Sequence, residues 1–253
     1  MELTDTDTSA PAPSSEVIVV IPAHNEVETA GAVIRAVRAQ GLPAVLVDDG
    51  STDGTREAAE RAGAVVVRLP VNLGVGAALR CGFRFAVENG YRVAIQCDAD
   101  GQHDPADMPL LLDAMKEEGA HLVVGNRFGA DRRMDVSRAR RLVMRILARV
   151  ASRAARRPIG DATSGFRAVS VPLLNEFARN YPAQYLGDTF EVLVASARAG
   201  YTVVATPTAI HARQGGLRTA GSAASVAFLV RALLVVTLRI GTRYRPANRS
   251  ERP

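Results

Sequence analysis

The densest group of chemically active side chains in the sequence is the segment CDADGQHDP, residues 97–105. Asp98 and Asp100 lie two positions apart after an apolar run, so both carboxylates can reach one cation at the end of a strand, and Gln102 adds a neutral oxygen. Oxygen ligands suit Mg²⁺ or Mn²⁺, which usually keep some water and bind substrate phosphates. The alternative is an acidic turn that closes a strand. An EF-hand calcium loop is excluded, because its twelfth position is Pro109 and not a glutamate.

A second acidic group follows an earlier apolar run in VLVDDGSTDGT, residues 45–55. Asp48 and Asp49 are adjacent at the end of the run, and a glycine-containing turn separates them from Asp53. Carboxylates at the end of a strand can accept hydrogen bonds from a base or a ribose. The alternative is a capped turn, since Ser, Thr and Asp are residue types that begin helices.

Both groups need a frame that brings strand ends together. Five apolar runs are typical of strands: 17–21, 44–47, 64–68, 92–97 and 121–125. Stretches with helical spacing accompany them: 26–40, 53–62, 74–89 and 106–118. This alternation predicts an α/β fold with a doubly wound, mostly parallel sheet, in which ligands bind beyond the carboxyl ends of the strands.

Residues 135–157 have the spacing of one long amphipathic helix with a basic stripe. The stripe consists of arginines at three- and four-residue steps: Arg138, Arg141, Arg145, Arg149, Arg153 and Arg156. A second amphipathic helix is expected over 222–240, where Arg231 and Arg239 interrupt the apolar run, so no transmembrane helix is expected. We therefore expect a cytoplasmic protein whose membrane contact, if any, is peripheral and on the cytoplasmic face.

Composition argues against several classes of function. The two cysteines, at positions 81 and 97, lack metal-type spacing, which fits a reducing compartment. Residues 1–15 are polar and rich in Pro and Ser, and are expected to form a disordered leader. A dinucleotide fingerprint is not complete, because Leu79 stands where its third glycine would be. With 5% aromatic residues and an acidic site, the chain is not expected to bind nucleic acid.

Eight short motifs occur in order over about residues 17–240: IPAHNE, VDDGSTDGT, NLGVGAAL, CDADGQHDP, VVGNRF, DATSGFRAV, FEVLVASARAGY and RQGGLR. In this order they resemble the inverting family 2 glycosyltransferases, and within them the dolichyl/polyprenyl-phosphate mannose and glucose synthases. The resemblance implies a GT-A fold as a single domain over 16–240 with C-terminal amphipathic helices. A nucleotide-sugar half would occupy 16–126, an acceptor and membrane-facing half 127–240, and a basic tail 241–253.

The resemblance also implies roles for individual residues, carried over position by position. The donor nucleotide would be bound by Pro22, Ala23, Glu26, Asp48, Asp49 and Asp98. A Mg²⁺ or Mn²⁺ ion would be held by Asp98, Asp100 and Gln102. The acceptor phosphate would be bound by Arg127, Arg140, Arg141, Ser164, Arg167 and Arg213. The catalytic residues would be Asp100, Arg127 and Glu191.

The expected reaction is a metal-dependent, inverting transfer of a sugar from a nucleoside diphosphate to polyprenyl phosphate. GDP-mannose, UDP-glucose and UDP-N-acetylhexosamine all stay open as donors, because acidic residues can serve either base. A phosphate acceptor is already anionic, whereas a saccharide or other hydroxyl acceptor would need a base, for which Asp188 or Glu191 is the candidate. A non-catalytic nucleotide-sugar-binding scaffold is the alternative from another class, although an intact cluster of like charges argues against it.

A lipid acceptor also implies a membrane partner. The arginine stripe of 135–157, together with helix 222–240, is expected to dock on the cytoplasmic leaflet, where each arginine near anionic headgroups contributes about 1 kcal/mol. The alternatives are a solvated helix face and a small integral-membrane partner that tethers the enzyme.

Overall fold

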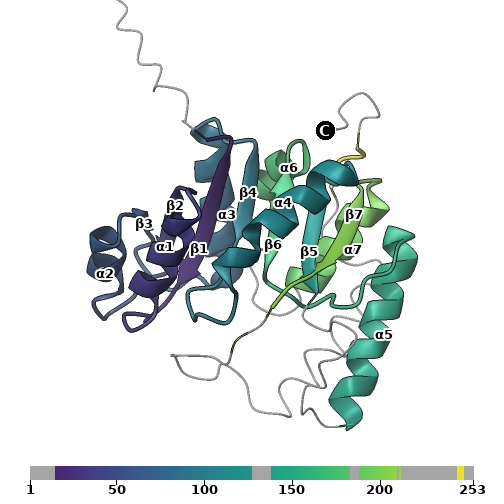
Figure 1. Ribbon diagram of the computed structural model, residues 1–253, viewed down its shortest axis with the longest axis horizontal. Coiled ribbons are helices and arrows are strands. Elements are labelled where there is room, and N and C mark those ends of the chain that lie inside the picture. Colours follow the sequence, from purple (N-terminus) through teal and green to yellow (C-terminus); the bar gives the residue numbers. More distant parts are fainter. Residues whose placement is uncertain (1–14, 127–137, 183–187, 210, 212–243, 248–253) are drawn as a thin grey trace, which may run out of the picture.

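The computed structural model describes residues 15–126, 138–182, 188–209, 211 and 244–247 (Figure 1). Residues 1–14 of the expected leader and the expected helix 222–240 lie outside the described residues. No helix among the described residues is both long enough and apolar enough to span a bilayer.

Among the described residues, seven strands form one sheet: β1 Val17–Ala23, β2 Ala44–Asp48, β3 Val65–Arg68, β4 Val93–Gln96, β5 Leu122–Asn126, β6 Arg167–Ser170 and β7 Val203–Pro207. Their order is β3-β2-β1-β4-β6-β5-β7. The pairs β1–β2, β1–β4, β2–β3 and β5–β7 are parallel, and only β6 runs antiparallel to its neighbours. The predicted α/β fold with a mostly parallel sheet is therefore confirmed. All five predicted strands are present, and β6 and β7 are additional.

The helices cover both faces of the sheet (Figure 1). They are α1 Ala30–Ala39, α2 Thr55–Arg61, α3 Val75–Glu88, α4 Met108–Glu117, α5 Arg138–Ala155, α6 Leu173–Asn180 and α7 Asp188–Arg198, and a 3-10 turn, η1 Pro105–Asp107, precedes α4. One face packs α1, α2 and α4 around a core that includes Ile34, Leu46 and Met108. The other packs α3, α5, α6 and α7 around a core that includes Phe83 and Phe177.

The central strands are continuous apolar runs in the sequence because helices cover both faces of the sheet. Every residue of β2 is buried, as are the last six of β1, whereas the edge strand β3 is half-exposed. Burial of each aliphatic side chain stabilises the fold by about 1.5–3 kcal/mol. The buried strands thus form a rigid base from whose ends the polar loops project.

The segment 244–247 packs on the body of the domain. Tyr244 is buried in the core, with its ring centroid 5.5 Å from that of Phe177. The backbone N–H of Arg245 donates to Glu176 Oε2, and that of Ala247 donates to the carbonyl of Ala199. Part of the expected basic tail therefore lies against α6 and α7, and we propose that the domain extends at least to residue 247.

Candidate active site

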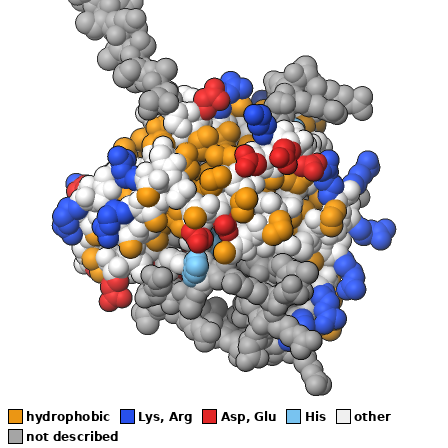
Figure 2. Space-filling model, in the orientation of Figure 1, with side chains coloured by type: hydrophobic (Ala, Val, Ile, Leu, Met, Phe, Trp, Pro, Cys, Tyr) orange, Lys and Arg blue, Asp and Glu red, His pale blue; other side chains and the backbone are white. Residues whose placement is uncertain are grey.

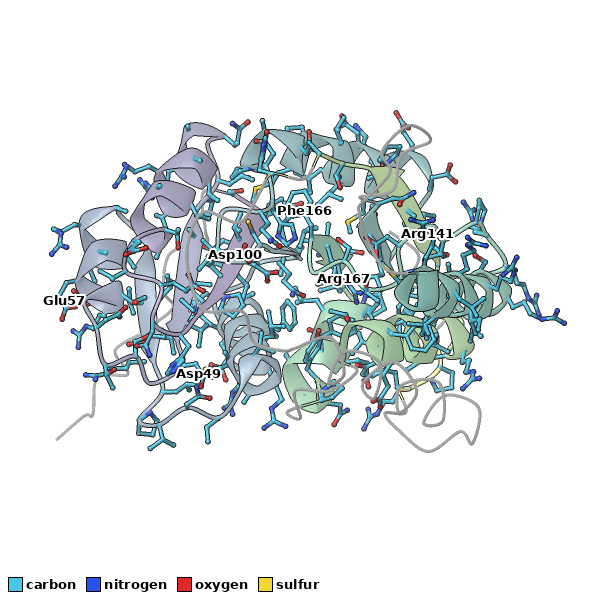
Figure 3. All side chains as sticks on the ribbon, turned by 90° about the horizontal axis from the view of Figure 1, so that it is seen from below. Asp49, Glu57, Asp100, Arg141, Phe166 and Arg167 are labelled. Carbon is cyan, nitrogen blue, oxygen red and sulfur yellow. The ribbon has the colours of Figure 1, made fainter. Side chains whose placement is uncertain are left out.

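The polar motifs of the first half meet at one edge of the sheet. Because β1, β2 and β4 are adjacent and parallel, their carboxyl ends lie side by side. Asp100 follows β4 and is seen in the view from below between Phe166 and Asp49, which is at the lower left (Figure 3), and Arg167 belongs to the strand that pairs with β4. This is the edge at which open α/β sheets bind ligands.

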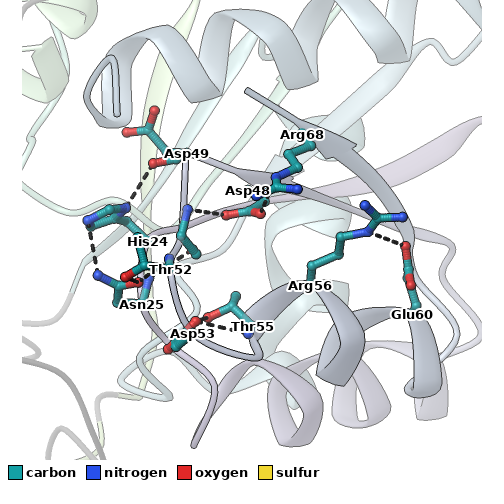
Figure 4. A network of polar contacts seen from close by, with 11 residues as sticks. His24, Asn25, Asp48, Asp49, Thr52, Asp53, Thr55, Arg56, Glu60 and Arg68 are labelled. Carbon is teal, nitrogen blue, oxygen red and sulfur yellow. Dashed lines mark hydrogen bonds and ion pairs between the residues drawn. The ribbon is translucent and has the colours of Figure 1, made fainter. Parts of the chain in front are cut away.

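The loops after β1 and β2 are joined by hydrogen bonds (Figure 4). The N–H of Asn25 donates to Ser51 Oγ at 3.0 Å, and the N–H of Thr52 donates to Asn25 Oδ1 at 2.9 Å. His24 Nδ1 lies 2.8 Å from the carbonyl oxygen of Asp49. The backbone N–H groups of Glu26 and Val27 also donate to the loop after β2, to Thr55 Oγ1 and Asp53 Oδ2, and α1 starts at residue 30 rather than at the predicted residue 26.

Asp48 and Asp49 are buried and their carboxylates accept backbone hydrogen bonds. Asp48 Oδ1 accepts the N–H of Ser51 at 2.8 Å, and Oδ2 lies 3.7 Å from Arg68 Nε. Asp49 accepts the N–H of Leu73 at 2.7 Å and that of Gly74 at 2.8 Å. The sequence left open whether these residues bind a nucleotide or build a turn, and the geometry gives both of them a loop-building role at the rim of the site.

Other residues that are expected to bind the donor nucleotide lie beside Asp48 and Asp49. Pro22 and Ala23 are buried at the end of β1. Glu26 is half-buried: its N–H donates to Thr55 Oγ1 at 2.8 Å, and its Oε2 accepts from Thr29 Oγ1 at 3.1 Å. The structure thus brings the residues expected to bind the nucleotide to one place, although their contact with a nucleotide stays a prediction.

The loop after β4 presents the two expected metal-binding carboxylates. The side chain of Asp98 is 39% exposed, and Asp100 and Gln102 are half-buried. The loop is closed on itself, since the N–H of Gln102 donates to Asp100 Oδ1 at 3.0 Å and that of Asp98 donates to His103 Nδ1 at 3.3 Å. Asp98 and Asp100 therefore extend from a short, fixed turn.

These side chains fit a hard divalent cation that is bound by the protein and by a phosphate together. Asp98 and Asp100 offer carboxylate oxygens and Gln102 offers a neutral amide oxygen, and a set of oxygen ligands suits Mg²⁺ or Mn²⁺. Among the described residues, no group of three or more His, Cys, Asp or Glu side chains could hold a metal ion by itself. Mg²⁺ is commonly held by one or two carboxylates together with substrate phosphates and water, so two carboxylates are sufficient.

The turn between α5 and β6 forms the back of this loop. Ser164 is fully buried, and Arg167 is 3% exposed. Arg167 donates through Nε to the carbonyl of Ser164 at 2.7 Å and through Nη2 to that of Ala162 at 3.4 Å. The expected role of Ser164 and Arg167 at the acceptor phosphate stays a prediction, and the contacts described give Arg167 a role in folding the turn.

A segment that follows β7 lies against the loop and η1. The N–H of His211 donates to the carbonyl of Gln102 at 2.9 Å, and its Nε2 lies 3.0 Å from Asp104 Oδ2. The N–H of Ala209 donates to a carboxylate oxygen of Asp107. Sequence reasoning missed these contacts, because no spacing within the chain links positions about a hundred residues apart.

The remaining expected residues fall in different places. Arg127 and Arg213 lie outside the described residues, as does the side chain of Arg140. Arg141 is exposed near the start of α5, away from Asp100 in Figure 3. Glu191 is half-buried in the first turn of α7, and its charge adds to burial in raising the pKa of Tyr244 well above its usual value.

The sequence of the chain was compared with models of known protein families. Residues 18–177 match the model of glycosyl transferase family 2. The chain belongs to this family. Polyprenol monophosphomannose synthase of Mycolicibacterium smegmatis is 30% identical over 220 residues, which are 81% of this family 2 chain and 81% of that protein. Undecaprenyl-phosphate mannosyltransferase of Micrococcus luteus is 30% identical over 218 residues, 79% of this chain and 85% of that one.

A crystal structure supports the GT-A fold of this family 2 protein. Glucosyl-3-phosphoglycerate synthase from Mycobacterium tuberculosis, in complex with Mn²⁺, uridine diphosphate and phosphoglyceric acid, matches with a TM-score of 0.67 and 25% identity over 90% of this chain and 79% of that chain. Other relatives are longer: the match covers 65% of a Haloferax volcanii glycosyltransferase and 46% of an uncharacterized Methanocaldococcus jannaschii protein.

Proposed function

We propose that this family 2 protein transfers a sugar from a nucleoside diphosphate to polyprenyl phosphate with the help of Mg²⁺ or Mn²⁺. The observation that carries the proposal is the closed turn that presents Asp98, Asp100 and Gln102 beside the ends of β1 and β2. The names of the two mannosyl-transferring relatives favour a prenyl-phosphate acceptor. The complex of the structural neighbour supports a divalent cation with a nucleoside diphosphate.

The donor would bind where the loops after β1 and β2 meet. The buried Asp49 fixes the segment 72–74 through two backbone hydrogen bonds, and Asp48 fixes the turn at Ser51. A rim held in this way is preorganised, so little conformational entropy is lost when a nucleotide binds. We propose the half 16–126 as the donor-binding part of the chain, with GDP-mannose, UDP-glucose and UDP-N-acetylhexosamine as candidate donors.

The metal would be held by Asp98, Asp100 and Gln102. When bound, the cation would neutralise the donor diphosphate and stabilise the departing nucleoside diphosphate. The two carboxylates are separated by one residue on a turn closed by the bonds to His103 and Gln102, which limits their motion. Their part in the reaction is to hold a positive charge in a fixed position before the reaction begins.

The acceptor half would supply the positive charges that receive a phosphate. Arg141 is exposed. We propose that Arg141, together with Arg127, Arg140 and Arg213, binds the phosphate of the acceptor. Because a phosphate oxygen is already anionic, positioning and charge neutralisation can carry most of the catalysis without a strong base. Glu191, or Asp188 at the start of α7, would be the base only if the acceptor were a hydroxyl.

The test is a panel of radiolabelled nucleotide sugars with Mn²⁺ or Mg²⁺, with and without polyprenyl phosphate in vesicles. We expect one donor to give a lipid-extractable product, and Asp100→Ala to lower its rate at least a hundredfold. Asp113→Ala, an exposed carboxylate on α4, is the matched control and should leave the rate unchanged. A parallel assay replaces the polyprenyl phosphate by saccharides: product on a saccharide alone would indicate the hydroxyl-acceptor reaction, and donor binding without turnover of any acceptor would indicate a scaffold.

The proposal includes a peripheral membrane contact through α5. This helix carries no acidic residue, and its arginines at 145, 149 and 153 are exposed at steps of four. On α2 and α3, by contrast, Arg56 and Arg84 each pair with a glutamate four positions later. Like charges at this spacing repel, which costs the isolated helix a few tenths of a kcal/mol per pair. An anionic surface would relieve that repulsion.

Basic side chains gather over α5, at the right of Figure 2, and others lie at the left and at the top of the same view. A wide, open depression on this helix is lined by Arg145, Ala148, Arg149, Ser152 and Arg153, and Leu142 is 56% exposed one turn away. Charge and exposed apolar surface together favour phospholipid headgroups as the partner.

Charge reversal tests the membrane contact. We expect the triple variant of Arg145, Arg149 and Arg153 to Glu to lose cosedimentation with vesicles that contain anionic lipid. The control reverses three exposed arginines of the donor half, Arg35, Arg61 and Arg92, and so changes the net charge equally. Equal loss in both variants would reduce the effect to net charge, and retained binding in the α5 variant would point to a membrane-protein tether instead.

A further inference from the structure

His103 lies directly behind the first carboxylate of the β4 loop. Its side chain is 4% exposed, although it follows a turn at the surface edge of the sheet. Its Nδ1 accepts the N–H of Asp98 at 3.3 Å, and its Nε2 lies 3.9 Å from Oδ2 of the same residue. An Nδ1 that accepts a hydrogen bond leaves the proton of the neutral ring on Nε2. The ring therefore holds the backbone N–H of Asp98 through Nδ1, and its Nε2 lies near the carboxylate but beyond hydrogen-bond distance.

The hydrogen bond from the Asp98 N–H to His103 Nδ1 lies directly after the last residues that β4 pairs with the sheet. β4 ends at Gln96, and the N–H of Cys97 still donates to Val20 of β1. Asp98 is the next residue, so the imidazole supplies the acceptor that a neighbouring strand would otherwise supply. The backbone that carries the carboxylate is thus fixed by a side chain five positions later.

Phe166 fixes the imidazole itself. The two rings stack with their centroids 5.1 Å apart and an interplanar angle of 23°. Phe166 is fully buried, and it belongs to the turn that Arg167 folds through the carbonyls of Ala162 and Ser164. The ring of His103 therefore has little freedom to rotate.

Gly165 closes the other side of the carboxylate. A Cβ atom on Gly165 would lie 2.9 Å from Asp98 Oδ2 and 3.3 Å from Gln96 Nε2, so the backbone of the turn lies directly on the carboxylate. A methyl group here would push the end of a short side chain aside. A side chain at position 165 would therefore act on the direction of the Asp98 carboxylate rather than on the fold of the turn.

We propose that His103 and Gly165 are positioning residues for Asp98: the imidazole fixes its backbone N–H, and the backbone at Gly165 limits the space beside its carboxylate, so that the carboxylate keeps the direction needed to bind the cation. This inference rests on the proposed function, because it takes Asp98 as a metal ligand. Residues that orient a ligand in this way typically change metal affinity 10–100-fold when they are replaced. The turn 161–167 would then contribute to metal binding without touching the metal.

The test measures Mn²⁺ affinity by electron paramagnetic resonance, with Mn²⁺ alone and with added UDP or GDP, and so needs no turnover. We expect His103→Leu to raise the Kd for Mn²⁺ at least tenfold. His103→Asn places an oxygen where Nδ1 was, so it should recover more than half of that loss on a logarithmic scale. A purely structural role would not produce this recovery.

His121 provides a matched control within the same chain. It is equally buried, its Nδ1 accepts the N–H of Thr202 at 3.1 Å, and its ring contacts Tyr201. His121→Leu thus removes the same kind of bond and ring contact away from the β4 loop, and the Kd should stay within twofold of the wild type. Equal Mn²⁺ affinity in His103→Leu and His121→Leu would overturn the proposal.

Gly165→Ala gives a second route if His103→Leu does not fold. Its backbone is not in the left-handed region, so the added methyl acts through Asp98 rather than through strain. We expect a Kd at least tenfold higher, with Gly54→Ala as control, since a Cβ there meets only a Val27 methyl at 3.3 Å. Wild-type affinity in Gly165→Ala would count against the proposal.

Asp98→Asn separates this inference from the proposed function. Loss of Mn²⁺ binding in this variant, with unchanged binding in the variants of His103 and Gly165, would reject the positioning role and keep the metal site. Unchanged Mn²⁺ binding in Asp98→Asn would reject the metal site, and the positioning role with it.

Discussion

The carboxylate of Asp49 joins two loops that are 25 residues apart, because its Oδ2 accepts the N–H of Gly74 at 2.8 Å. Its Oδ1 accepts the N–H of Leu73 at 2.7 Å, so both oxygens are used. One buried side chain thus connects the end of β2 to the start of α3 and fixes the backbone of segment 72–74 beside the proposed donor site.

Asp49→Ala should therefore weaken both folding and donor binding. Two backbone N–H groups lose their acceptor, and we expect a loss of about 2 kcal/mol in the free energy of unfolding, measured in urea. The Kd for UDP or GDP, measured by calorimetry, should rise at least threefold because the segment 72–74 is released. Unchanged stability would contradict the anchoring role.

Asp53 gives a prediction for the pH dependence of stability. Burial alone would raise its pKa, but hydrogen bonds from the side chain and backbone of Thr55 and from the backbone of Val27 outweigh burial and lower the pKa. A carboxyl group with a lowered pKa in the folded state stabilises the protein above its unfolded pKa, and this contribution is lost as the pH falls through the folded pKa.

We expect Asp53→Asn to melt below the wild type at pH 7 and to approach it as the pH falls below about 4. The difference should be small, on the order of 0.5 kcal/mol, because the side chain is exposed and solvent screens it. Thermal unfolding followed by circular dichroism from pH 7 to pH 3 measures it. A difference that is the same at both ends of this range would exclude a titrating contribution.

Arg167 allows a choice between two roles. If it folds the turn, Arg167→Lys loses the paired bonds to Ala162 and Ser164, since an ammonium group does not reproduce the geometry of a guanidinium, and stability should fall by about 2 kcal/mol. If it binds the acceptor phosphate, the KM for polyprenyl phosphate should rise while stability stays constant. Urea unfolding and acceptor kinetics on the same variant decide between them.

The two thiols should differ in reactivity. Burial raises the pKa of Cys97 well above its usual value, and it also raises that of the half-buried Cys81. A raised pKa lowers the thiolate fraction at pH 8, so a disulfide reagent should modify at most Cys81 in the native protein and both thiols after denaturation. Cys81→Ser should leave the native protein unreactive, and rapid reaction of two thiols would show that Cys97 is accessible.

The sequence was informative where a pattern is local. The runs at 17–21 and 44–47 are apolar on both faces and could be recognised as buried strands. The residue types of DADGQ predict a turn after a strand. β6 has four residues, and its place depends on pairing with Gln96 about seventy positions earlier, so no local pattern reveals it. The contacts of His103 were missed for the same reason, since its neighbour Phe166 comes from that strand's turn.

The antiparallel strand in the middle of the sheet also bears on how the chain emerges during synthesis. β4 has one edge covered by β1, and its other edge is taken by β6, which is made after β5. β5 pairs only with β6 and β7 among the described strands, so it has no sheet to join when it first appears. A nascent chain that has passed β5 therefore exposes an open, apolar edge at β4, which is a point of vulnerability to mispairing until the turn at 161–167 has delivered β6.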